Sequence, residues 1–105
     1  MSVSIAENTN ELSVLLKRDW RMLIGGELVS AKSGQTMETF APYDGSFLAN
    51  VPLAGAEDVD AAVQAGQAAF PAWRDTPLTE RVALIRRFAA RLVERASDFG
   101  LLDAA

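Results

Sequence analysis

The sequence predicts an α/β chain in which short antiparallel strands, including one tight hairpin, come first and two to three helices follow. Apolar and polar residues alternate in short runs between residues 20 and 51, whereas from residue 55 the apolar residues recur with a helical period of 3.6. Glycine and proline pairs divide the first part into strand-length pieces. At 105 residues the chain has the length of one domain at most, and a chain of this size is expected to be only marginally stable by itself.

Residues 1–19 are expected to form a flexible tail ahead of the folded part. The first ten residues are polar and follow no sustained period, as is usual for a frayed terminus. Residues 11–18 carry three leucines at helical spacing, which indicates one or two helical turns. The folded part is therefore expected to span residues 20–105.

A glycine pair marks the first connection between strands. Trp20–Ile24 and Glu27–Ala31 are apolar runs on either side of Gly25-Gly26. Two glycines tolerate the positive φ angles that a two-residue hairpin turn requires, so the pattern predicts a tight β-hairpin. Because the pair joins two strands and opens no helix, we do not interpret it as a phosphate-binding loop.

Two further strands are expected after this hairpin. Ser33-Gly34 makes a turn, Thr36–Phe40 follows as a strand, and a turn at Pro42–Gly45 leads into a strand over Ser46–Val51. Pro52 cannot donate to a strand ladder and is expected to stop the last strand. The four strands are expected to form a hairpin-rich sheet.

The helical part is expected to divide at two prolines. The first helix runs from about Ala56 to Phe70, and Pro71 ends it. Thr76 is the expected N-cap of a second helix, with Pro77 at its first position, and Ser97 caps a short third helix. The second helix carries a wide apolar stripe that needs covering on two sides. Its residues are Leu78, Val82, Ile85, Ala89, Leu92 and Ala96, widened by Leu84, Phe88 and Val93.

Composition excludes several classes of function. Ten basic against 14 acidic side chains give a net charge of −4, which argues against nucleic-acid binding. The chain has no cysteine and no histidine, which removes disulfides, thiolate nucleophiles, and the commonest general base and metal ligand. No apolar run is long enough for a membrane span, and the first ten residues do not resemble a secretory signal. We therefore expect a cytoplasmic protein, and no catalytic motif is apparent from the chemistry alone.

Charged and aromatic clusters are interpreted as structural. A basic helix face is formed by Arg81, Arg86, Arg87, Arg91 and Arg95. Acidic residues among them favour a solvated face with local ion pairs, some of the arginines meeting another domain. Glu57, Asp58 and Asp60 point in different directions around a helix, so complementation of the helix dipole is favoured over metal binding. Trp20 and Trp73 are interpreted as packing anchors beside turns rather than as ligand platforms.

A series of short motifs then runs through the chain in a fixed order. The segments are Leu23–Val29, Ser33–Gly45, Ala49–Pro52, Ala56–Val63, Ala68–Trp73, Thr76-Pro77, Glu80-Arg81 and Leu84–Arg87. Together they resemble the start of the aldehyde dehydrogenase superfamily over roughly residues 20–105. Each motif is loose, but the set is specific. Ala41, where the family usually has Asn, and Gly55, in place of a hydroxyl N-cap, depart from the pattern.

The resemblance implies an incomplete N-terminal part of an oxidoreductase that oxidises aldehydes to carboxylic acids with NAD or NADP. In such enzymes a Cys attacks the aldehyde, hydride passes to the nicotinamide, and a Glu-activated water releases the acyl group while an Asn helps to hold the oxyanion. None of these motifs falls in this segment, so no catalytic or cofactor-binding residue is assigned. The chain is expected to be inactive by itself and to bind no NAD or NADP. Its expected partners are the remainder of the dehydrogenase chain and, in the complete enzyme, further copies of itself.

The resemblance carries over one ligand site. Some family members hold a monovalent cation with oxygens from the strand that matches Thr39 and Phe40, which makes these two residues the candidate metal ligands. Two donors alone would not retain an ion, and an ordinary strand is the alternative interpretation. For the whole chain, the alternative hypothesis is a stand-alone small interaction module that uses its broad apolar helix face.

Overall fold

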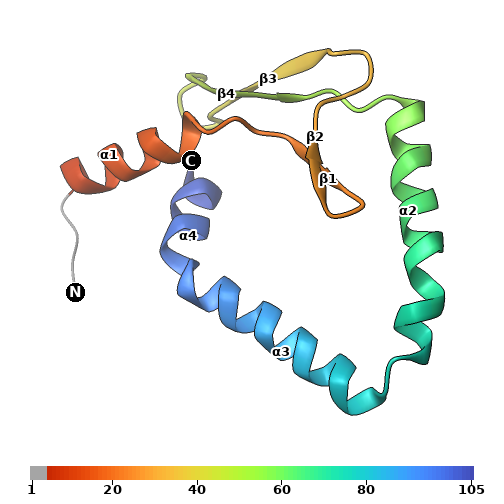
Figure 1. The fold of residues 1–105 in the computed structure, drawn as a ribbon. Coiled ribbons are helices and arrows are strands. Elements are labelled where there is room, and N and C mark those ends of the chain that lie inside the picture. Colours follow the sequence, from red (N-terminus) through yellow and green to blue (C-terminus); the bar gives the residue numbers. More distant parts are fainter. Residues whose placement is uncertain (1–4) are drawn as a thin grey trace.

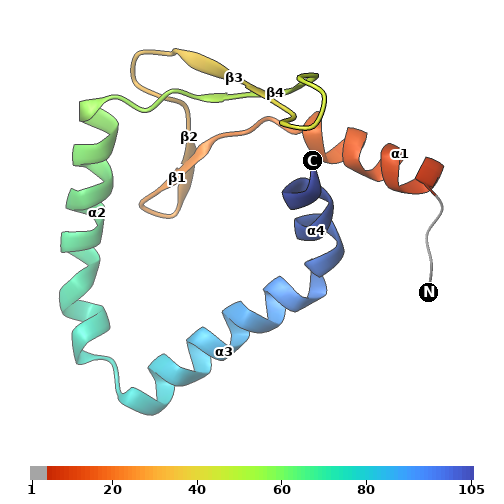
Figure 2. The same ribbon diagram turned by 180° about the vertical axis from the view of Figure 1, so that it is seen from behind.

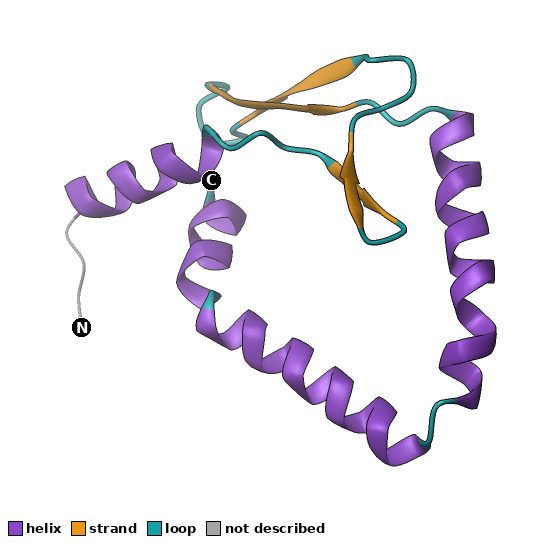
Figure 3. Cartoon of the chain, in the orientation of Figure 1, coloured by secondary structure: helices purple, strands orange, loops and turns teal. Residues whose placement is uncertain are grey.

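The computed structural model describes residues 5–105, which form helices and strands in a simple order (Figure 1). Strands and helices are separated along the chain after the first helix, as the sequence predicts (Figure 3). The elements are α1 (Ile5–Leu16), β1 (Met22–Ile24), β2 (Glu27–Val29), β3 (Thr36–Phe40), β4 (Phe47–Pro52), α2 (Ala56–Asp75), α3 (Leu78–Glu94) and α4 (Ala96–Ala104).

The predicted glycine hairpin is confirmed. β1 and β2 pair antiparallel, with Ile24 opposite Glu27 next to the turn. Gly25 has a φ of 61° and Gly26 a φ of 82°, a combination that residues with a Cβ rarely adopt. A Cβ built on Gly25 would lie 3.8 Å from the Cβ of Ala65, so this turn lies next to α2.

The second strand pair forms a separate two-stranded sheet, because β3 pairs with β4 alone. Its ladder runs from Thr36 opposite Pro52 to Phe40 opposite Phe47, with an irregularity that leaves Leu48 without a partner. Pro52 was expected to stop the strand and is instead its last residue. At an outer strand the missing N–H of a proline breaks no ladder bond, and the N–H of Leu53 continues the pairing with the carbonyl of Gln35 at 2.9 Å.

The predicted end of the first long helix at Phe70 is wrong. α2 continues through Pro71 to Asp75. A proline inside a helix lacks one N–H and its ring crowds the carbonyl four residues earlier, which bends a helix without necessarily ending it. The sequence rule is therefore too strict at this position, and the predicted break at Phe70–Trp73 does not exist.

The corner between the long helices lies at Thr76 and Pro77. The N–H of Thr76 donates to the carbonyl of Trp73 at 3.2 Å, and its hydroxyl donates to the carbonyl of Ala72 at 2.7 Å. Thr76 thus closes α2 and does not cap the next helix as predicted. Pro77 takes the N-cap position, one residue ahead of the α3 start at Leu78.

The short third helix is confirmed as α4, with a different cap. Arg95, rather than Ser97, is the residue at its N-terminal boundary. The guanidinium of Arg95 forms an ion pair with Asp98 at 2.8 Å, which lies in the first turn of α4. Asp98, three residues after Arg95, thus supplies the ion-pair partner of the Arg95 side chain.

The N-terminal residues contain more helix than expected. α1 begins at Ile5, whereas the sequence indicates one or two turns starting at Glu11. Residues 1–4 lie outside the described part of the chain. α1 packs against α4, and Leu15 is buried at 8% exposure. Tertiary packing therefore stabilises a helix that polar local sequence does not predict.

The chain is spread out in an arc with a small core. In Figures 1 and 2 the strands form one side, α2 and α3 two further sides, and α4 returns toward α1. The radius of gyration is 17.5 Å, against about 13 Å for a compact chain of this length. The buried apolar residues of the described chain are Leu15, Ala31, Ala41 and Ala49. Most large apolar side chains therefore remain on the surface.

Candidate functional site

The two residues expected to bind a cation are neighbours at the end of β3. The hydroxyl of Thr39 donates to the carbonyl of Ala49 at 3.1 Å across the ladder. Phe40 lies opposite Phe47, and their rings meet edge to face with centroids 6.2 Å apart. The ladder irregularity falls between these two candidate residues.

Thr39 and Phe40 do not make a cation site by themselves. A hard cation takes several oxygen ligands, and two consecutive residues of one strand supply two carbonyls and a hydroxyl that already donates elsewhere. Among residues 5–105 there is also no group of three or more acidic, histidine or cysteine side chains that could hold a metal ion. Cation binding at this strand stays a prediction that requires oxygens from other residues.

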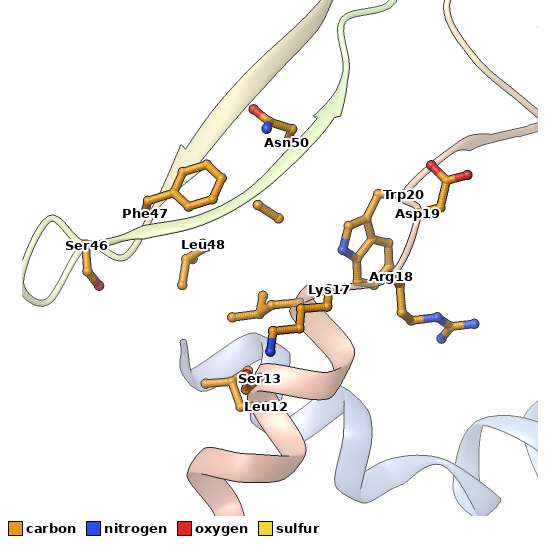
Figure 4. A pocket seen from close by; sticks show the side chains of 12 residues that line it. Leu12, Ser13, Lys17, Arg18, Asp19, Trp20, Ser46, Phe47, Leu48 and Asn50 are labelled. Carbon is orange, nitrogen blue, oxygen red and sulfur yellow. The ribbon is translucent and has the colours of Figure 1, made fainter.

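A hollow of about 720 Å³ lies between the end of α1 and β4 (Figure 4). Apolar side chains cover much of it, and cationic side chains stand at its edge. Its lining consists of Leu12, Ser13, Leu16, Lys17, Arg18, Asp19, Trp20, Ser46, Phe47, Leu48, Ala49 and Asn50. The hollow thus joins the first helix to the second strand pair.

Trp20 is the central aromatic residue of this hollow. Its ring lies between the end of α1 and β4 (Figure 4), and the guanidinium carbon of Arg18 is 5.8 Å from the ring centroid. The indole Nε1 is buried and has no hydrogen-bond partner among the described residues. A buried N–H without an acceptor is costly.

The polar groups of the hollow favour contact over catalysis. Asp19 pairs with Arg21 at 2.8 Å on the surface, and the Ser46 hydroxyl donates to Asp44 at 2.7 Å. Asp44 is a poor base for the Ser46 hydroxyl, because the hydrogen bonds that it accepts from Ser46 lower its pKa. The arrangement offers a packing surface with cationic edges.

Asp58 has a role that the sequence interpretation missed. Its side chain is buried at 4% exposure and accepts hydrogen bonds from the N–H of Gly55 at 2.9 Å and the N–H of Lys32 at 3.1 Å. These bonds, first Gly55 and then Lys32, lower the pKa of Asp58. The carboxylate therefore ties the loop after β2 to the start of α2.

A sequence signal for this role was available. Asp58 is three residues after Gly55, the spacing at which a side chain reaches back to the N-cap N–H. Complementation of the helix dipole explains why an acidic residue stands at this position, but it does not predict the hydrogen bond from the N–H of Lys32, which is 26 residues away. Contacts at that separation cannot be derived from local spacing.

Three arginines in α3 and at its end, Arg81, Arg91 and Arg95, have different surroundings. Arg91 pairs with Glu94 at 3.5 Å and Arg95 with Asp98 at 2.8 Å, both on the surface, which confirms the expected local ion pairs. Arg81 is only partly exposed, and its Nε is buried with no partner among the described residues.

Of the helices in the described part of the chain, none is long and apolar enough to span a membrane.

Comparison with known proteins gives a consistent result. The Aldehyde dehydrogenase family matches residues 28–105. The chain is 37% identical over 91 residues to a malonate-semialdehyde dehydrogenase of Bacillus pumilus, covering 84% of this chain and 19% of the relative. It is 44% identical over 78 residues to a vanillin dehydrogenase of a Pseudomonas species, covering 74% of this chain and 16% of the relative. A malonate-semialdehyde dehydrogenase of Pseudomonas aeruginosa is 42% identical over 80 residues, which cover 76% of this chain and 16% of the relative. The chain thus spans less than a fifth of the length of these relatives.

Proposed function

Because the chain belongs to the aldehyde dehydrogenase family, we propose that it is the N-terminal, architectural part of an oxidoreductase that oxidises aldehydes to carboxylic acids with NAD or NADP. The observation that carries this proposal is the family match over residues 28–105, which includes the second strand pair and the helices α2, α3 and α4. The wide apolar surface of the helices supports a role in covering a larger protein.

We further propose that these 105 residues have no dehydrogenase activity by themselves and bind no NAD or NADP. The absence of cysteine leaves no thiolate to attack an aldehyde. The nucleophile, the oxyanion donors and the cofactor site are then contributed by the remainder of the dehydrogenase chain. We place the complete enzyme in the cytoplasm as a homo-oligomer, with no nucleic-acid or membrane partner.

The first experiment measures activity of the chain alone. The purified 105-residue chain is incubated with aliphatic and aromatic aldehydes and NAD or NADP, and the absorbance of the reduced cofactor is followed. We expect no rate above that of a heat-treated control. Turnover above this control would contradict the architectural role.

The second experiment tests whether the chain can act as the N-terminal part of a working dehydrogenase. In a chimera, this chain replaces the matching segment of the Pseudomonas vanillin dehydrogenase, to which it is 44% identical. We expect the chimera to oxidise vanillin, whereas the same enzyme without any such segment is insoluble or inactive. An inactive chimera beside an active parent enzyme would contradict the proposed function.

This segment is not expected to select the aldehyde. Relatives named for malonate semialdehyde and for vanillin match it at 37% and 44% identity, although the two aldehydes differ in size and aromaticity. We therefore propose that substrate choice, like the choice between NAD and NADP, is decided by other residues of the complete enzyme.

A stand-alone interaction module is the second candidate function. It is favoured by the exposed apolar residues of α3, such as Phe88 at 66% exposure. The two candidates differ in the chimera experiment, since a segment that acts as a separate interaction module would not restore vanillin oxidation.

A further inference from the structure

One face of α3 combines exposed apolar side chains with a single cation. At 100° per residue, Arg81, Ile85, Phe88 and Leu92 lie within a narrow stripe along the helix. Ile85 is 59% exposed, Phe88 66% and Leu92 40%, and no residue of α3 is buried. We call these four residues the α3 stripe.

Arg81 differs from the other arginines of this helix in position and surroundings. Arg86 and Arg87 fall on the opposite side of α3 by the same helical spacing, and both are exposed. Arg91 forms a surface ion pair. Arg81 alone lies within the apolar stripe with its Nε buried and without an acceptor among the described residues.

The position of Arg81 makes the missing acceptor more significant. The residue lies in the first turns of α3, near the positive end of the helix dipole, where a cation is disfavoured. Its guanidinium takes part in none of the ion pairs of the described residues. The Nε–H is covered without an acceptor, which is costly. Because the residue as a whole is partly exposed, its side chain can turn toward an oxygen acceptor that docks on this face.

The area of uncovered surface indicates the size of the missing partner. The chain exposes 8427 Å², whereas a compact protein of 11.3 kDa exposes about 5,700 Å². The excess is about three times the ~800 Å² that each side contributes to an ordinary protein interface. A second copy docked through an ordinary interface would leave most of this excess uncovered. The family relatives are more than five times as long as the part they share with this chain, which is enough to cover it.

We propose that the α3 stripe is a docking surface for the remaining part of the aldehyde dehydrogenase chain, with Arg81 as its polar anchor. The guanidinium of Arg81 turns to donate to a carbonyl or carboxylate oxygen of that part, and Ile85, Phe88 and Leu92 pack around the bond and exclude water. The inference rests on the proposed function and adds to it a specific contact and the chemistry of the acceptor.

The test uses the vanillin dehydrogenase chimera and a matched pair of substitutions. Arg81→Met keeps an unbranched side chain of similar length without the donor, and Arg87→Met makes the same change on the opposite side of α3. We expect Arg81→Met to lower the melting temperature of the chimera by about 3 °C or more, while Arg87→Met changes it by less than about 1 °C. In the isolated 105-residue chain, both variants should keep the helical circular dichroism of the unsubstituted chain.

Each outcome bears on a different claim. If the chimera is stable and active, and its Arg81→Met and Arg87→Met variants have the same melting temperature, the role of Arg81 is overturned and the proposed function stands. Loss of helical circular dichroism in the isolated Arg81→Met chain, but not in the isolated Arg87→Met chain, would also overturn it. The partner of Arg81 would then lie within these 105 residues. A chimera that is inactive beside its active parent would contradict the proposed function, and the docking surface with it.

Discussion

The strand half and the helical half of this chain are stabilised in different ways. Between residues 22 and 52, four glycines with φ angles of 61° to 82° close the turns, and each strand pairs with its neighbour in sequence. From residue 56 onward, Asp58 is the only buried residue of the three helices α2, α3 and α4. The strand half is therefore determined by contacts close in sequence, whereas the helical half has almost no buried residues in the described part of the chain.

The difference explains why apolar patterning alone does not make a core. The apolar residues of α3 repeat with good helical spacing, yet most of the stability of a helix in a protein comes from tertiary packing of its apolar face. Three of the four buried apolar residues are alanines from the strand half, which contribute little apolar area. Under the proposed function, we expect substitutions in the two halves to respond differently to the presence of the rest of a dehydrogenase.

The largest effect is expected for Phe88→Ser on the α3 stripe. In the chimera, Phe88 should be buried, so the variant should lose about 3–5 kcal/mol in urea unfolding. In the isolated chain Phe88 is 66% exposed, and the change there should stay within about 0.5 kcal/mol. Arg86→Ser, on the other side of the helix, serves as control. Equal losses in both backgrounds would show that the chain covers this face by itself.

Smaller effects on stability, of opposite sign, are expected when a glycine is replaced by alanine in each half. Gly26→Ala places a Cβ on a residue with φ of 82°, which should cost about 1–2 kcal/mol. Gly66→Ala lies inside α2, and no atom outside the surrounding helix backbone lies within 4 Å of the new Cβ, so the change should stabilise by about 0.5–1 kcal/mol. Amide hydrogen exchange of β1 and of α2 measures both. Destabilisation by Gly66→Ala would mean that α2 is not an open helix at that position.

The smallest effect is expected for the contact that joins the two halves. The pKa of Asp58 lies below its ordinary value of 3.8, so its contribution to stability is complete above that value and is lost as the pH falls through the lowered pKa. The amide resonances of Gly55 and Lys32, its two donors, should therefore shift together with a midpoint below 3.8.

Asp58→Asn should abolish this shared acid transition. The control is Asp60→Asn, whose carboxylate bonds only to Gln64 on the helix surface. If the Gly55 and Lys32 amides titrate with different midpoints, or still titrate in Asp58→Asn, a different group ties the loop to α2.

Much of the strand half could be predicted because its determinants are local. Gly25-Gly26 indicates a two-residue turn wherever it occurs between apolar runs, and the structure has that turn. The expected strand Thr36–Phe40 appears with the same limits. The end of β4 differs from the prediction by one residue, because the strand includes Pro52. A proline weakens a strand only where its missing N–H would have bonded to a neighbouring strand, and β4 has a neighbour on one side only.

The errors in the helical half follow from rules that depend on context. Pro71 was expected to end a helix that in fact continues, since a helix already fixed on both sides of a proline can bend rather than stop. The length of α1 depends on its packing against α4 at the far end of the sequence. For the candidate site, the sequence indicated Thr39 and Phe40 but not the hollow around Trp20, because the hollow joins segments about thirty residues apart.

The central claim is that the helical half becomes stable only against the remaining enzyme, and hydrogen exchange in two backgrounds tests it most directly. Amide exchange would be compared residue by residue between the isolated 105-residue chain and the active vanillin dehydrogenase chimera. We predict that β1 to β4 exchange at similar rates in both, whereas α3 is strongly protected in the chimera and nearly unprotected in the isolated chain. Equal protection of α3 in the two proteins would contradict the account.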